Sequence, residues 1–128
     1  MRFGKSVNYA ILAVGYIARQ DKSVRSYEIG KEYSIPLEYL LKILQQLVRA
    51  NILSSKRGPA GGFTLAKTRK QINLLQIVEA AEGPVEEQLG LTEQASGDKF
   101  ARKTETQYKK VAKQTKASLK KIRLDDLI

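Results

Sequence analysis

A row of polar side chains recurs at helical spacing between residues 36 and 50. Its members lie four, three and four residues apart, so a helix would place them on one face. A cationic side chain there can pair with a phosphate or with guanine, and a glutamine can pair with adenine. Solvated surface helices show the same pattern, so the row alone is a candidate site. Its members are Glu38, Lys42, Gln45 and Arg49.

A second cationic feature follows, where Lys56 and Arg57 precede the run GPAGG. The β-prone runs ILSSKR and FTLAKT flank it, which predicts an antiparallel hairpin. A two-residue hairpin turn needs only one or two glycines, whereas this loop has three, and glycine lets the backbone come close to a partner. No Lys-Ser/Thr helix start follows, which argues against a phosphate-cradling loop. We therefore expect the hairpin to carry its cations to a partner; a plain turn is the alternative.

The residue types that the chain lacks exclude several classes of function. Its 128 residues suit one domain with an appended arm, and they include no cysteine and no histidine. Disulfides, the usual zinc sites and catalysis by Ser–His or Cys–His pairs are therefore excluded. No acidic cluster indicates a carboxylate metal site. We expect a protein that is not an enzyme and that carries no cofactor or metal.

The charge balance favours a polyanionic partner. The formal net charge is +10 and the isoelectric point is near 9.9, and a charge this large attracts nucleic acid at long range. A basic domain can also be basic only for solubility. No apolar run approaches the ~20 residues that span a bilayer, and the N-terminus lacks a secretory cleavage site, so we expect a cytoplasmic protein without a membrane partner.

Apolar periodicity places these features on helices and a hairpin. Helices are expected over residues 6–19, from Ser26 to about Tyr33, over 36–50, from Asn73 to Gly83, and over 98–121. Their expected N-caps are Ser6, Ser26, Asn73 with Gln76 in a capping box, and Asp98. Two short helices followed by a hairpin are typical of a winged helix-turn-helix. The predicted fold class is mainly α with a small β-hairpin, a winged helix-turn-helix plus a long C-terminal helix.

Three parts of the chain are expected. Residues 1–84 form the winged helix-turn-helix, 85–97 a linker that could be disordered, and 98–128 a long helix with a tail. The long helix has a thin apolar seam, since its less polar residues fall at three- and four-residue spacing from Ala101 to Ile122.

The segment "EIG…SIPLEYLLKILQQLVRANILSSKRGPAGGFTLAKT…INLLQIVEAAEGP" resembles the Rrf2 family of bacterial winged-helix transcription regulators over about residues 6–84. Its most specific part is KRGPAGGFTLA, close to the wing motif of the family. The resemblance implies a homodimer that binds double-stranded DNA, with one helix per subunit in the major groove and the wing in the minor groove. It also implies that Tyr39 is the recurring tyrosine of the recognition helix and that Arg57 is the wing arginine.

Spacing and resemblance together give the candidate contact residues. For DNA they are Ser26, Tyr27, Pro36, Leu37, Glu38, Tyr39, Lys42, Gln45, Arg49, Lys56, Arg57, Gly58, Ala60 and Gly61. Because the long C-terminal helices of the family pair with each other, the candidate dimerisation residues are Tyr108, Val111, Thr115, Leu119 and Ile122.

The chain departs from the family in two places. Leu41 stands where many members carry a glutamate, so it cannot accept a hydrogen bond from cytosine. Iron–sulfur members place three cysteines in the region matching residues 85–105, where this chain has none. The chain is then a clusterless member with a protein or small-molecule effector, or an engineered form in which Ala95 and Ala101 replace cysteines. The alternative function is a protein-interaction module whose main partner is a metabolic enzyme.

Overall fold

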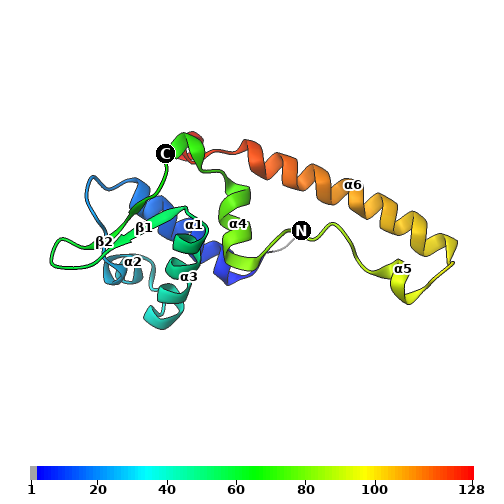
Figure 1. Ribbon diagram of the computed structural model, residues 1–128, viewed down its shortest axis with the longest axis horizontal. Coiled ribbons are helices and arrows are strands. Elements are labelled where there is room, and N and C mark those ends of the chain that lie inside the picture. The colour runs from blue at the N-terminus through cyan, green and yellow to red at the C-terminus, as the bar shows by residue number, and fades with distance from the viewer. Residues whose placement is uncertain (1–2) are drawn as a thin grey trace.

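Two parts make up the computed structural model, which describes residues 3–128: a winged body and a long helix that projects from it (Figure 1). The body consists of α1 (Lys5–Ala18), α2 (Ser26–Tyr33), α3 (Leu37–Arg49) and α4 (Leu74–Glu82), and the hairpin of β1 (Leu53–Lys56) and β2 (Gly62–Leu65) projects from one side of it. The 3₁₀ turn η1 (Arg69–Gln71) leads into α4. Later in the chain come α5 (Leu91–Gln94), α6 (Lys99–Lys121) and the terminal 3₁₀ turn η2 (Leu124–Leu127), which packs back on the body. The predicted fold class is confirmed.

One apolar core joins α1, α3 and α4 beneath the hairpin. The helices bury the sides that their three- and four-residue periodicity predicted, and each fully buried Leu or Ile contributes about 1.5–3 kcal/mol. The largest fully buried side chains are Ile29, Leu40, Ile43, Leu44, Leu47, Ile52, Leu53, Ile72 and Ile77. The outward side of α3 has no part in this core and is free for another role.

A tight turn joins α2 to α3. Ser34 takes a left-handed conformation (φ 54°), and Ile35, which follows it, is buried. A Cβ added to Gly30 would lie 3.2 Å from the carbonyl oxygen of Ile35. The close approach of this turn therefore favours the helix-weakening glycine in α2.

Two of the four predicted helix caps are confirmed and two are wrong. The side chain of Asn73 accepts a hydrogen bond from the backbone of Gln76, and that of Asp98 accepts one from Ala101. Ser6 lies inside α1, whose N-cap is Gly4, and its hydroxyl donates instead to Glu82 at 3.3 Å. Ser26 is the first residue of α2 rather than its cap. Arg25 holds the cap position, and its backbone N–H donates to the Glu28 carboxylate at 2.8 Å.

The segment between the body and α6 is tied down by a carboxylate. Glu105 accepts hydrogen bonds from the backbone N–H groups of Leu89 (2.7 Å) and Leu91 (2.9 Å). The Leu89 bond is the main reason that the pKa of Glu105 lies below its usual value. The structure thus places a short helix, α5, inside the predicted linker. The side chain of Glu105, on α6, holds this segment through the two hydrogen bonds.

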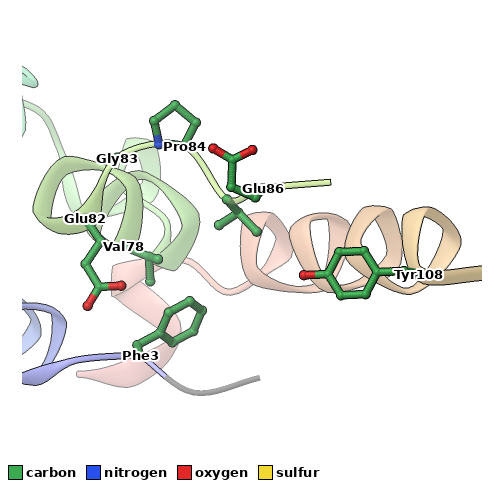
Figure 2. A pocket seen from close by; sticks show the side chains of 8 residues that line it. Phe3, Val78, Glu82, Gly83, Pro84, Glu86 and Tyr108 are labelled. Atoms are coloured by element: carbon green, nitrogen blue, oxygen red, sulfur yellow. The ribbon is translucent and has the colours of Figure 1, made fainter. Parts of the chain in front are cut away.

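The C-terminal end and the middle of the α6 region contact the body. At its C-terminal end, Leu124 is buried, and its N–H donates to the carbonyl of Ile72 at 2.8 Å. Midway along α6, Tyr108 lines a cavity of about 250 Å³ with Phe3, Val78 and the residues that follow α4 (Figure 2). Within residues 3–128, no helix is long and apolar enough to cross a membrane.

Candidate nucleic-acid interface

The outward side of α3 carries the predicted row of polar residues. Glu38, Lys42, Gln45 and Arg49 are all exposed, while the opposite side of the helix is buried. The helix start is exposed too, and Leu37, a candidate contact residue whose spacing also matches the apolar side of the helix, is 50% exposed. The row thus forms a surface that packing in the body does not require.

Tyrosine and leucine side chains adjoin this row. Tyr39 is 44% exposed, and its ring meets that of Tyr9 edge-on, with centroids 5.4 Å apart. The contact fixes the ring of Tyr39 from the side of α1 and leaves its other edge in solvent. Leu41 is 40% exposed.

The two strands of the hairpin pair as expected, and a residue from outside the hairpin pairs with β2. Leu53 lies opposite Leu65, and Lys56 lies opposite Gly62. Val24, just before α2, forms a bridge with Phe63, with hydrogen bonds of 3.0 and 2.7 Å between their backbones. The bridge joins β2 of the wing (residues 53–65) to the start of the helix-turn-helix. No local pattern in the sequence marks this pairing.

Arg25 holds the tip of the wing. Its Nη2 donates hydrogen bonds to the carbonyl oxygens of Gly58 (2.9 Å) and Pro59 (2.8 Å). The sequence reasoning missed this residue, because the two partners lie more than 30 positions away in the chain. The only signal in the sequence was that Arg25 is a cationic residue directly before a predicted helix start.

The wing glycines have different roles. Gly58 has a φ of 100°, a left-handed value that suits glycine, and its carbonyl accepts from the N–H of Gly61. Gly61 is buried, and a Cβ there would lie 2.3 Å from the carbonyl oxygen of Lys56. The close packing of the loop therefore needs glycine at position 61, which leaves little of this residue exposed to a partner. Gly58 and Ala60 remain exposed.

A cleft of about 300 Å³ lies between the start of α2 and the wing. It brings Ser26 and Tyr27, which the sequence placed among the candidates, to the two wing cations. Tyr27 is 62% exposed, and Ser26 is half-buried. The residues that line the cleft are Arg25, Ser26, Tyr27, Ser55, Lys56, Arg57, Gly62 and Phe63. Candidates from two separate segments thus meet at one surface that can hold an anionic backbone.

The candidate dimerisation residues do not share one environment. Four of them, Tyr108, Thr115, Leu119 and Ile122, are half-buried within the single chain. Val111 differs, because its side chain is 55% exposed.

Ligands for a metal are missing from the described part of the chain. In residues 3–128, no group of three or more histidine, cysteine or acidic residues is placed to hold a metal ion. The whole sequence has no cysteine, and iron–sulfur clusters are held by cysteine thiolates. The residues present therefore do not fit such a cluster.

Known proteins resemble this chain in sequence and in fold. The sequence model of the Rrf2 family, described as iron-dependent transcriptional regulators, matches residues 3–128. The HTH-type transcriptional regulator IscR of Cereibacter sphaeroides is 34% identical over 89 residues, which are 66% of this chain and 57% of that protein. The chain spans about half to two thirds of the length of the curated relatives that it matches.

Two solved structures have the same fold over nearly all of this chain. The global cysteine regulator CymR of B. subtilis superposes with a TM-score of 0.80 at 20% identity, covering 99% of this chain and 95% of that one. IscR of T. potens also gives 0.80, at 22% identity, covering 99% and 85%.

Proposed function

The chain belongs to the Rrf2 family of transcriptional regulators, and from this premise we propose that it is a homodimer that binds a specific DNA site, its operator. The observation that carries the proposal is the exposed surface shared by the outward side of α3, the start of α2 and the wing. Such a surface matches duplex DNA, because an α-helix fits the major groove and a cationic loop can reach an adjacent groove. A DNA partner implies the cytoplasm as its compartment.

The residues of α3 bind different groups of the DNA according to their chemistry. Lys42 and Arg49 bind phosphates or guanine, and Gln45 binds adenine or a phosphate. Glu38, near the start of the helix, can accept from the amino group of cytosine. Leu41 replaces a hydrogen-bonding residue with an apolar one, which can contact only the methyl group of thymine.

The wing supplies the minor-groove contact. Arg57 is exposed at the root of the loop, and arginine is favoured in narrow minor grooves because the electrostatic potential there is strongly negative. Lys56 and the exposed loop backbone bind the phosphates beside it. Arg25 keeps the loop in place but has its own hydrogen bonds within the protein, so we assign it a positioning role.

The dimer forms along an uncharged stripe of α6. Phe100, Gln107, Val111 and Ser118 are exposed and lie seven, four and seven residues apart, which places them on one side of the helix. Phe100 is 76% exposed and Val111 is 55% exposed, so both have apolar area to bury against a second copy. The half-buried residues Tyr108, Thr115 and Leu119 instead hold α6 in its own chain.

Regulation proceeds without an iron–sulfur cluster in this proposal, because the chain offers no thiolate to hold one. An effector of another kind, a protein or a small molecule, then sets the affinity for the operator.

Selection of bound fragments from random duplex DNA tests the proposal. We expect a two-fold symmetric sequence to emerge, with half-sites about one helical turn apart or a multiple of it. Recovery of fragments without any common sequence would refute specific recognition, and a single asymmetric half-site would refute the dimer.

A further inference from the structure

Most of the net charge of the protein resides on α6. This helix contains nine Lys or Arg residues and one Glu, a net charge of +8, whereas the whole chain carries +10. The proposed operator surface on the body is therefore not where the excess charge lies. The wing and the far end of α6 occupy opposite ends of the molecule (Figure 1).

The charges on α6 form two exposed rows along one side. Arg102, Lys109, Lys113 and Lys120 make the first row, at intervals of seven, four and seven residues. Lys99, Lys103, Lys110 and Lys121 make the second row beside it. The only α6 cation with an ion pair in the described residues is Lys116, which lies outside both rows, 3.8 Å from Glu87.

This basic side is turned away from the rest of the chain. Ala101 and Ala112, the two buried residues of α6, lie on the opposite side, together with the half-buried Tyr108 and Thr115. The uncharged stripe through Phe100 and Val111 is on a third side, next to the second row, so a dimer formed there leaves the first row in solvent. A helix that lies on a membrane needs a continuous exposed apolar side opposite its charges, and here that side is packed within the chain.

We propose that the two basic rows of α6 bind the phosphates of duplex DNA outside the operator, without sequence preference. From Arg102 to Lys120 the first row is ~27 Å long at 1.5 Å per residue. That length corresponds to about eight base pairs of duplex at 3.4 Å each. Unpaired cations at this spacing displace counterions from a phosphate backbone, and the gain is electrostatic and independent of sequence. The contact extends the proposed function, since it holds the regulator on DNA away from its site.

Charge-matched variants test the inference. The triple variant Lys109→Gln, Lys113→Gln, Lys120→Gln removes three charges from the first row, and Lys5→Gln, Lys31→Gln, Lys70→Gln removes three exposed charges elsewhere. Glutamine favours helix about as well as lysine, so both chains keep their helices. The readout is fluorescence anisotropy with a 40-base-pair duplex that lacks the operator, titrated at a series of salt concentrations.

We expect the α6 variant to lose at least tenfold in affinity at low salt relative to the control variant. Its slope of log affinity against log salt should fall by about 2.7, which is 0.9 for each of three lost phosphate contacts. Equal losses in both variants would show only a general charge effect and overturn the inference, as would no loss in either. Intact DNA binding with loss of binding to phosphatidylglycerol vesicles would also overturn it, because the partner is then a lipid surface.

The same variants separate this inference from the proposed function. On a minimal operator duplex, the α6 variant should bind within about threefold of the unaltered chain, because its recognition surface is intact. A chain that selects no operator but shows the α6-dependent slope would refute specific regulation and keep this inference. Operator binding together with equal affinities of the α6 variant and the control variant for the long duplex would support specific regulation and refute this inference.

Discussion

The guanidinium of Arg25 donates a hydrogen bond to the carbonyl oxygen of Gly58 at 2.9 Å, across 33 positions of the chain. A second bond from the same nitrogen reaches Pro59, so the tip of the wing is fixed to the residue that precedes α2. The proposed recognition surface therefore has a defined shape before DNA arrives. A pre-ordered loop binds more tightly because less conformational entropy is lost on association.

Replacing Arg25 by alanine should free the wing without unfolding the body. The two bonds are solvent-exposed, so the free energy of unfolding should fall by no more than ~1 kcal/mol. Operator affinity should fall several-fold, with increased mobility of the Gly58 and Gly61 amides in NMR relaxation. Arg25→Lys is the control, because it keeps the charge but lacks the planar fork of donors. Unchanged amide mobility in the alanine variant would refute the positioning role.

Arg57→Ala tests the wing contact itself. If Arg57 contacts bases, operator binding should weaken by about 1–3 kcal/mol and discrimination at one position should relax. A phosphate contact alone would lower affinity on every sequence and flatten the salt slope by about one. Exposed Lys70 lies beyond the wing, and Lys70→Ala provides a control that removes one charge. An Arg57 variant with the affinity of the parent chain would remove the wing from the interface.

Gly61→Ala should destabilise the fold, whereas Gly15→Ala should not. A Cβ at position 61 would lie 2.3 Å from the carbonyl oxygen of Lys56, so the loop backbone must shift. At Gly15, inside α1, a Cβ meets nothing within 4 Å. We expect about 1–3 kcal/mol lost for the first and about 0.5–1 kcal/mol gained for the second, since alanine favours helix over glycine. Urea denaturation measures both, and equal midpoints would contradict the assigned role of Gly61.

Local patterns predicted the polar surface of α3 because the spacing of apolar residues indicates which side of a helix is buried. The Asn73 and Asp98 caps were predictable for the same reason, since a cap and its partner lie three residues apart. Arg25 and Val24 were not predictable, because their partners in the wing lie far along the chain. Ser6 and Ser26 are not caps because each helix starts at or before its serine, with Gly4 and Arg25 at the cap positions. The carboxylate of Glu82 accepts from the Ser6 hydroxyl, and that of Glu28 accepts from the N–H of Arg25.

The role of Gly61 shows a further limit of the sequence. Three glycines in one loop indicate that the backbone is crowded or close to a partner, but they do not distinguish the two. The three-dimensional structure of the loop is needed to distinguish Gly58, which is exposed and has a φ of 100°, from Gly61, which is buried. The tie between Glu105 and Leu89 was hidden likewise, since a carboxylate on a lysine-rich helix looks like an ordinary surface residue.

Acid should loosen the segment before α6 through Glu105. The backbone N–H of Leu89 stabilises the carboxylate, so the pKa in the folded chain lies below that in the unfolded chain. The stabilisation is therefore present above the unfolded pKa and is lost as pH falls through the folded pKa. Hydrogen exchange at Leu89 and Leu91, corrected for the intrinsic pH effect, should lose protection at acid pH. Glu105→Gln should abolish the pH dependence and Glu93→Gln should keep it; protection that is independent of pH in the unaltered chain would refute the tie.

Val111→Arg should break the proposed dimer, because it places a charge in the middle of the uncharged stripe. The side chain is 55% exposed in the single chain, so the substitution leaves the packing of α6 on the body intact. Ala117→Arg is the matched control: it adds the same charge to the same helix at an exposed position on the basic side. Analytical ultracentrifugation at micromolar concentration should find a monomer for the first variant and a dimer for the second. Operator affinity should fall with the dimer, since each monomer then binds one half-site alone. Dimers in both variants would move the interface to another part of the chain, and a monomeric unaltered protein would end the two-fold model of recognition.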